Sequence, residues 1–332
     1  MNFPITKPDP FHILASSKNV MEQAKFVSIS QQAVGENVKK IGEYLKEHAD
    51  FPDHGHWLTG DYETDLQLIF FENMMGFCFW TIPGKPKWGI EMPNGEKVDG
   101  WYGVCASFKR AHDEEMPVTD ANFWAKAERS DIERVFQSAT EAKIPLLDER
   151  ARILNENGKI LQEHFGGRVE NLLQAAGHDI VLLTRLLLER FPSYRDIAVY
   201  NGEEVVFLKL VHLLALDLEY RLTSQSQRPF LKNFDQLCVF ADYKLPQLLR
   251  AFGVLGYAQQ LAGKVDSYQV IPKGSAEEVE MRAGAVLGIE LLRQQLPEYS
   301  SIQIGHVVWL MSQDQNLQSQ VKPYHRTYTT YY

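Results

Sequence analysis

The chain has 332 residues, of which 45% are hydrophobic and 23% charged, a balance that excludes a largely disordered chain. Its formal net charge of −9 argues against a long basic groove for nucleic acid. The start of the chain lacks the pattern of a signal peptide, and no stretch reaches the roughly 18 apolar residues that span a bilayer. We therefore expect a cytoplasmic protein that binds neither a membrane nor a nucleic acid polymer. Three widely spaced cysteines without a CxxC pair agree with a reducing compartment.

The first predicted elements are a helix and a β-hairpin. Apolar residues recur three and four positions apart between residues 38 and 45, which predicts one apolar helical face. Two short strand-like runs, 87–92 and 96–102, flank Pro93-Asn94-Gly95. Asn-Gly between such runs is a strong hairpin signal because both residues tolerate positive φ. We expect one β-hairpin here and helix nearly everywhere else.

Three later helices carry their own signals. Residues 180–191 repeat apolar side chains at helical spacing, and Asp179 is placed to cap their N-terminus. The apolar run 205–218 predicts a buried core helix. Ser275 followed three residues later by Glu278 is a capping-box pattern, which predicts the start of another helix.

These elements predict a mainly α fold in a single compact domain over residues 1–332. A polar stretch around residues 112–119 suggests a division into an aromatic, hairpin-bearing lobe (1–140) and a helical lobe (141–332). The run 324–328 has too many aromatic residues for a free tail, so we expect it to pack on the body.

Several catalytic motifs are missing. The chain has no Walker A loop, GxGxxG, HExxH or GxSxG, so P-loop, Rossmann and zincin chemistry have no support. His54 and His56, beside Asp53, are the one local pattern that suggests a metal ligand set. Two histidines two apart in a loop are more typical of surface residues, so we expect no metal ion.

The segment 72–80 is rich in aromatic residues. Phe77 and Trp80, together with Trp101 of the predicted hairpin, form either a piece of core or a slot in which a planar base stacks. In the second interpretation Asn73 is placed to address the polar edge of that base.

Asp242 lies in the segment from Phe240 to Gln247. Pro246 suits the first turn of a helix, so Asp242 comes just before a positive helix N-terminus that favours an ionised carboxylate. An ordinary capping aspartate fits the same pattern, and both interpretations stay open.

Charged residues on apolar helices form the remaining candidates. Lys209, on the apolar run, either receives a phosphate, extends its ammonium to the surface, or is paired with Asp196 or Asp217. Arg195 offers a second cation with similar alternatives. Glu278 and Arg282 are four residues apart, which by default indicates a surface ion pair. Glu280 points elsewhere on that helix and is a candidate ligand for a polar base edge.

Taken together, these segments resemble the queuosine-salvage family, the queuosine 5′-phosphate N-glycosylase/hydrolases, from about residue 25 to the C-terminus. The resemblance is carried by the ordered set Phe77-Cys78-Phe79-Trp80, Gly100-Trp101-Tyr102, the segment 152–161, Phe191-Pro192-Ser193-Tyr194-Arg195-Asp196, Phe240-Ala241-Asp242-Tyr243-Lys244-Leu245-Pro246-Gln247, Glu278-Val279-Glu280-Met281-Arg282 and Tyr331-Tyr332.

The resemblance implies a helical fold related to the DNA glycosylases, with a small hairpin insertion and no metal or organic cofactor. It also implies a mononucleotide substrate, queuosine 5′-monophosphate, with a 7-deazaguanine base, queuine. The family's aspartate maps onto Asp242, and its paired glutamates map onto Glu278 and Glu280.

Physical reasoning then assigns roles to these residues. Asp242 stabilises the positive charge that builds on the sugar, and Glu280 or Asn73 bonds the base edge. The rings of Phe77, Trp80, Trp101 and Phe240 hold the base by stacking. The 5′-phosphate needs cations, and we expect them among Lys244, Lys209, Arg195 and Arg326.

Two other functions stay open. A base-excision glycosylase acting on DNA would share the fold, but it predicts a basic groove that the net charge does not favour. A non-catalytic protein that binds queuine or a nucleotide needs the same aromatic pocket and would release no free base.

Overall fold

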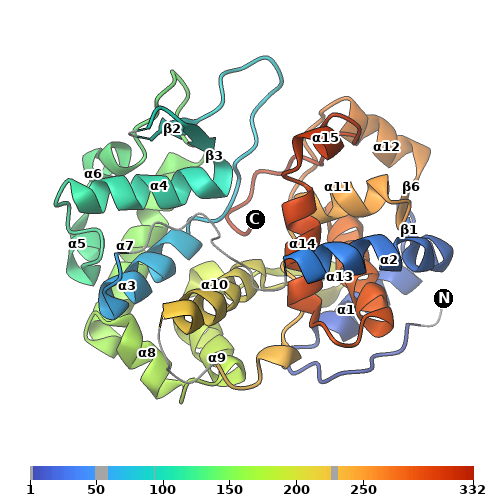
Figure 1. Ribbon diagram of the computed structural model, residues 1–332, viewed down its shortest axis with the longest axis horizontal. Helices are drawn as coiled ribbons and strands as arrows, with labels where there is room; N and C mark the ends of the chain where they lie inside the picture. Colours follow the sequence, from blue (N-terminus) through green and yellow to red (C-terminus); the bar gives the residue numbers. More distant parts are fainter. Residues whose placement is uncertain (1–2, 49–58, 93, 226–230) are drawn as a thin grey trace.

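The computed structural model describes residues 3–48, 59–92, 94–225 and 231–332, and this part of the chain is mainly helical, as predicted (Figure 1). His54 and His56 lie outside the described residues. The helices are α1 (Ile13–Glu22), α2 (Gln31–Glu47), α3 (Tyr62–Asn73), α4 (Gly100–Asp113), α5 (Ala121–Lys126), α6 (Arg129–Val135), α7 (Leu147–Phe165), α8 (Val169–Ala175), α9 (Ile180–Arg190), α10 (Lys209–Gln225), α11 (Lys244–Ala251), α12 (Gln259–Asp266), α13 (Ala276–Gln295), α14 (Ser301–Met311) and α15 (Gln315–Gln318).

The helices gather in two groups that face each other in Figure 1. Helices α3 to α10 form the first group, and α1, α2 and α11 to α15 form the second. The groups do not follow the expected division at residue 140, because α1 and α2 pack on α13 while α7 packs on α5. Buried apolar side chains from both groups form one core cluster. The C-terminal tail runs between the groups, so the predicted packing of this aromatic segment is confirmed: the backbone N–H of Ile271 donates to the Arg326 carbonyl at 2.7 Å.

Helix α13 runs through the middle of the second group. Every residue from Glu277 to Leu292 is buried, which is typical of a helix surrounded by other elements on all sides. The Ser275 hydroxyl accepts from the backbone N–H of Glu278 at 3.3 Å, and Asp179 caps α9 in the same way, so both predicted caps are confirmed.

The predicted β-hairpin is confirmed as β2 (Gly89–Glu91) paired with β3 (Lys97–Asp99) in antiparallel register. Its second strand is shorter than expected. Gly100 has φ of 59°, a value that favours glycine, and there the chain turns directly into α4.

Two further small sheets were not predicted. Strand β4 (Ile197–Tyr200) pairs with β5 (Glu203–Val206), and β1 (Val27–Ile29) pairs with β6 (Leu255–Tyr257). The β4–β5 turn is Asn201-Gly202, and both of its residues have positive φ, as a two-residue hairpin turn requires. The predicted core helix therefore begins only at Lys209, because Val205 and Val206 belong to β5.

A buried carboxylate ties the N-terminal segment to α13. Glu280 accepts the backbone N–H groups of Lys25, Phe26 and Val27 at 2.6 to 3.1 Å, and the hydroxyl of Tyr200 at 2.9 Å. Its side chain is fully buried, so these donors replace the water that the charge has lost. Glu280 thereby joins strand β1, the β4–β5 hairpin and α13.

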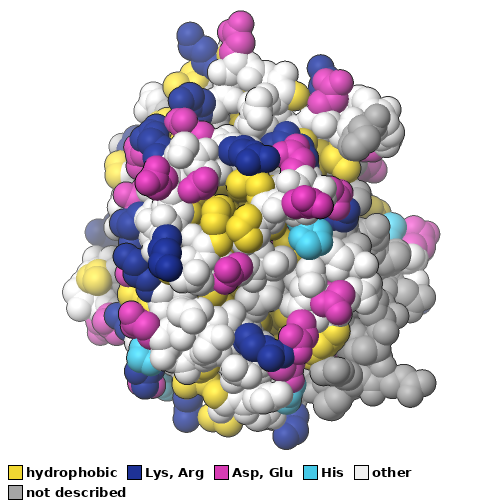
Figure 2. All heavy atoms as spheres, turned by 90° about the vertical axis from the view of Figure 1, so that its left-hand side faces the viewer, with side chains coloured by type: hydrophobic (Ala, Val, Ile, Leu, Met, Phe, Trp, Pro, Cys, Tyr) yellow, Lys and Arg dark blue, Asp and Glu magenta, His cyan; other side chains and the backbone are white. Residues whose placement is uncertain are grey.

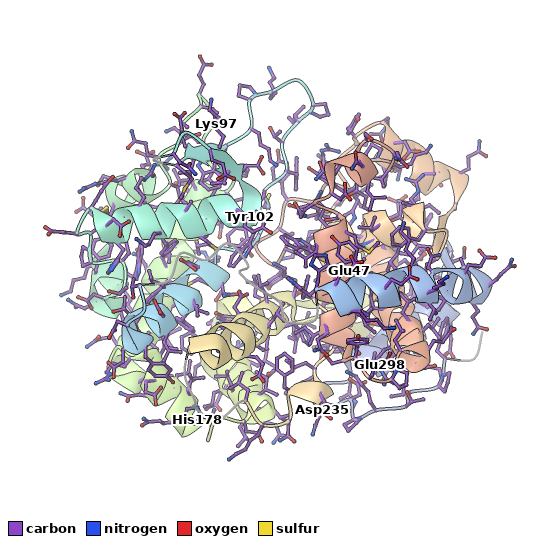
Figure 3. All side chains as sticks on the ribbon, in the orientation of Figure 1. Glu47, Lys97, Tyr102, His178, Asp235 and Glu298 are labelled. Carbon is purple, nitrogen blue, oxygen red and sulfur yellow. The ribbon has the colours of Figure 1, made fainter. Side chains whose placement is uncertain are left out.

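We predict that Glu280→Gln lowers the free energy of unfolding by about 3 kcal/mol, because one acceptor oxygen becomes a donor that faces other donors. Chemical denaturation checks the value. The matched control is Glu298→Gln on an exposed turn (Figure 3), which is expected to change stability by less than about 0.5 kcal/mol. Equal, small effects for the two variants would contradict this role of Glu280.

Candidate active site

A cavity of about 650 Å³ opens between the two groups of helices, a size typical of small-molecule sites. Its walls come from the hairpin, the start of α4, helix α10, the segment before α11, helix α14 and the tail. The lining residues are Gly76, Phe79, Lys87, Glu96, Lys97, Val98, Asp99, Gly100, Trp101, Tyr102, Lys209, Leu213, Leu216, Asp217, Phe240, Asp242, Tyr243, Lys244, His306, Trp309, Gln313, Gln318, Tyr324 and Tyr332.

Asp242 lies at the buried floor of this cavity with 7% of its surface exposed. Its Oδ1 accepts the backbone N–H groups of Lys244 and Leu245 at 2.8 and 3.1 Å, so it does cap α11. Its Oδ2 accepts no hydrogen bond from the residues that the structure describes. The cap and the cavity function are therefore compatible, because they use different oxygens of one carboxylate.

Lys209 supplies a positive charge at the same floor. It is buried at the start of α10, and its ammonium donates to the carbonyl oxygen of Gly76 at 2.6 Å. Burial lowers the pKa of Lys209 to about 8, against the opposing effects of Asp242, Asp217 and Asp196. Burial raises the pKa of Asp242, and Lys209 is the main influence that lowers it again. Each charge therefore offsets part of the free-energy cost of removing the other from water.

A buried ion pair holds these two residues in place. Arg282 of α13 donates to both oxygens of Asp196 at 2.9 and 2.5 Å, and to the carbonyl of Ala241 at 3.0 Å. Asp196 in turn accepts the backbone N–H of Lys209 at 3.1 Å. The expected surface pair between Glu278 and Arg282 was wrong in its location: both are buried, and Arg282 makes its close contacts with Asp196.

Aromatic side chains form much of the cavity wall. Trp101 and Phe240, two of the predicted stacking residues, line it together with Tyr243 and Tyr332. The rings of Tyr102 and Trp309 lie 5.9 Å apart and join α4 to α14 across the gap between the groups. Figure 3 shows Tyr102 at the end of α4 that faces the second group.

Phe77 and Trp80 do not line the cavity. The Arg150 guanidinium stacks on the Phe77 ring at 4.2 Å, and this ring is fully buried. The Trp80 indole N–H donates to the carbonyl of Thr327 at 3.0 Å. Both rings therefore pack the core and the tail, which was the other interpretation of this segment.

Asn73 lies one layer behind the wall. Its amide donates to Asp217 Oδ2 at 2.9 Å and to the carbonyl of Ile69, and Asp217 itself lines the cavity. Glu278 is placed in a similar way, because it accepts the hydroxyl of the lining residue Tyr332 at 2.8 Å. Both residues can orient the cavity wall without lining it.

Glu280, Arg195 and Arg326 are turned to other partners. Glu280 binds the N-terminal backbone, as described above. Arg195 donates to the carbonyls of Leu188 and Glu189 at the end of α9, and Arg326 donates to the carbonyls of Thr81 and Tyr324. None of the three lines the cavity, so we assign them no substrate contact.

Sequence reasoning missed several lining residues. Asp217 entered only as a partner of Lys209, and Lys87, His306 and Trp309 were not singled out. A lone histidine on an otherwise apolar stretch such as 302–311 is a usable signal, and it was overlooked. For Lys87 no local signal exists, because the hairpin brings it to the cavity.

The outer face of the first group of helices, seen in Figure 2, carries basic and acidic side chains interspersed with small hydrophobic groups, without a continuous basic stripe. Among the described residues, no cluster of three or more His, Cys, Asp or Glu side chains is arranged to hold a metal ion. None of the described helices combines the length and apolarity needed to cross a membrane.

The family profile and the similar proteins found by comparison all indicate the same family. The profile of a family described as queuosine salvage protein matches residues 56–332. A protein of Sphaerobacter thermophilus is 38% identical over 326 residues, which cover 98% of each chain. A mouse protein is 30% identical, covering 94% of this chain and 98% of its own, and one from Schizosaccharomyces pombe is 29% identical, covering 89% and 91%. All three bear the name queuosine 5′-phosphate N-glycosylase/hydrolase.

We predict that Lys209→Met raises the pKa of Asp242 further, because the main charge that opposes its desolvation is lost. A carbon-13 NMR titration of labelled aspartate carboxyls measures the shift, with Asp242→Asn identifying the resonance. Lys85→Met, which removes an equal charge from an exposed loop outside the cavity, is the control and should leave this pKa unchanged. An unshifted Asp242 in Lys209→Met would show that the two charges are not coupled.

Proposed function

The chain belongs to the queuosine salvage protein family, and from that premise we propose that it is a hydrolase cleaving the N-glycosidic bond of queuosine 5′-monophosphate. The products are queuine and ribose 5-phosphate, which makes queuine available for salvage into tRNA modification. One observation carries the proposal: a buried carboxylate, Asp242, shares the floor of an aromatic-walled cavity with a buried ammonium, Lys209.

Asp242 provides the negative charge that the reaction needs. Cleavage of an N-glycosidic bond builds positive charge on the sugar, as in glycoside hydrolysis. A carboxylate beside the anomeric carbon stabilises this charge and orients or deprotonates the attacking water. Its Oδ2 is available for this role, while Oδ1 holds the carboxyl against the start of α11. Lys209 favours the ionised form of Asp242 despite its burial.

A 7-deaza base has no N7 to protonate, so the departing base takes up at N9 the proton released by the attacking water, and its polar edge must be held in place as it leaves. A guanine-like edge presents N–H donors, and a carboxylate is the natural acceptor. Asp217 lines the cavity and is oriented by Asn73, so we assign it the role that the sequence suggested for Glu280. Trp101 and Phe240 supply the aromatic surfaces for the ring.

We propose a free mononucleotide as the substrate, rather than DNA or tRNA. The net charge of −9 favours a small ligand over a polyanion. The cytoplasm is the proposed location. Incubation with queuosine 5′-monophosphate, followed by chromatography of queuine and ribose 5-phosphate, tests the activity. A salt-sensitive gel shift with duplex DNA would favour the base-excision alternative, and stoichiometric binding without free base would favour a carrier.

We predict that Asp242→Asn still binds the nucleotide but lowers kcat by at least about a hundredfold, because an uncharged amide cannot stabilise the developing positive charge. Steady-state release of queuine and an equilibrium binding titration separate the two effects. The matched control is Asp235→Asn, an exposed residue in the short 3₁₀ helix 234–236 (Figure 3), which should keep full activity. Near-normal kcat in Asp242→Asn would remove Asp242 from the mechanism.

The pH dependence of kcat/KM should have two limbs. On the acid side the rate already falls at a pH above the usual aspartate range, because burial raises the pKa of Asp242 and only its ionised form is active. On the alkaline side the rate falls as pH rises through about 8, where Lys209 loses its proton. Rates measured from about pH 4 to 10 at constant ionic strength check both limbs. Lys209→Met should be slower and lack the alkaline limb, and a native profile that stays flat to about pH 9.5 would refute the assignment.

A further inference from the structure

Arg150 is a fully buried cation that does not line the cavity. It belongs to α7, in the first group of helices (Figure 1), and none of its surface is exposed. Its guanidinium lies 4.2, 5.4 and 5.9 Å from the ring centres of Phe77, Phe79 and Phe136. Among the residues that the structure describes, its hydrogen bonds go to carbonyl oxygens and to no carboxylate. A buried charge without a counter-ion is costly, which points to a function for these hydrogen bonds.

The hydrogen bonds of Arg150 fix one short segment of the cavity wall. Its Nη1 and Nη2 groups donate to the carbonyls of Met75 and Phe77 at 2.7 and 2.5 Å, and its Nε–H donates to the carbonyl of Pro145 at 2.9 Å. Gly76 lies between the two residues that the planar fork holds, and it lines the cavity. Two bonds from one rigid guanidinium set the orientation of the peptide groups on both sides of Gly76.

The carbonyl of Gly76 is the group that receives Lys209. The Lys209 ammonium donates to it at 2.6 Å, its hydrogen bond within the described part of the chain. The absence of a side chain leaves room for this contact, because a Cβ on Gly76 would lie 3.4 Å from Lys209 Nζ and 3.0 Å from Leu213 Cδ2. Three consecutive carbonyls therefore accept from two buried cations, the outer two from Arg150 and the middle one from Lys209.

We propose that Arg150 is a positioning residue of the active site: its guanidinium fork holds the segment 75–77 so that the Gly76 carbonyl fixes the Lys209 ammonium at the floor shared with Asp242. This inference rests on the proposed function and adds to it a residue that acts from behind the cavity wall. A carbonyl that accepts from an ammonium favours the charged form, so the fork also supports the protonation of Lys209.

The pKa of Lys209 separates this geometric role from a direct effect of the Arg150 charge. Burial lowers that pKa first. The charged groups that act on it, three carboxylates that raise it and one guanidinium that lowers it, are Asp242, Asp217, Asp196 and Arg282. If Arg150 acted as a nearby positive charge, its removal would raise the pKa of Lys209. If it acts through the Gly76 carbonyl, its removal lowers this pKa, because the ammonium loses its acceptor.

The test measures the pKa of Lys209 in Arg150→Met and in Arg150→Lys. A carbon-13 NMR titration of labelled lysine side chains follows the ammonium, and Lys209→Met identifies its resonance. In both variants we expect the pKa to fall by roughly one pH unit from its native value of about 8, because neither methionine nor a single ammonium can hold both carbonyls. The alkaline limb of kcat/KM should move to lower pH by the same amount. At neutral pH kcat should fall about tenfold, while KM changes by less than about threefold, since Arg150 does not line the cavity.

Arg152→Met is the matched control, because it removes the same charge from an exposed position on the same helix, where Arg152 pairs with Glu149 and Glu156. It should leave the pKa of Lys209, kcat and KM unchanged.

A raised or unchanged pKa of Lys209 in Arg150→Met, or a native pH profile in Arg150→Lys, would overturn the positioning role. If Arg150→Met does not fold, Arg150→Lys decides the question, because it keeps a cation among the three rings. If the native protein released no queuine at all, the proposed function would fail. The NMR titration, which needs no activity, would then still decide whether Arg150 positions Lys209.

Discussion

The buried pair between Arg282 and Asp196 is the interaction on which the arrangement of the site depends. Two opposite charges removed from water persist only when they are well matched, and this pair is bidentate with both side chains 2% exposed. The Nε–H of Arg282 donates to the carbonyl just before Asp242, and Asp196 accepts the backbone N–H of Lys209, the first residue of α10. One pair therefore sets the distance between the acidic and basic residues of the floor.

This placement explains how two charged groups persist at the buried floor of the cavity. Burial opposes the ionised form of both Asp242 and Lys209, and each moderates the cost for the other. A carboxylate held in this way is poorly solvated, so its ionised form interacts strongly with a cation that forms beside it. The cost of burying the Asp242 charge is therefore reduced when the sugar becomes positively charged in the proposed reaction.

Local patterns in the sequence predicted those features that depend on residues a few positions apart in the chain. Caps and periodicity indicated the helices, and Pro246 placed Asp242 at the start of α11. Long-range contacts were beyond such patterns. Glu280 was assigned to a base because nothing near it reveals that the backbone of 25–27 arrives from far along the chain. The β4–β5 hairpin differs: its Asn201-Gly202 turn was a readable signal that was overlooked.

In the proposed mechanism the anomeric carbon of the nucleotide lies against the side chain of residue 242. A crystal structure of Asp242→Asn with intact queuosine 5′-monophosphate measures this directly. We expect the substituted amide side chain to contact the anomeric carbon and the base to lie against the rings of Trp101 and Phe240. A nucleotide whose ribose lies away from position 242, or one bound outside this cavity, would contradict the mechanism.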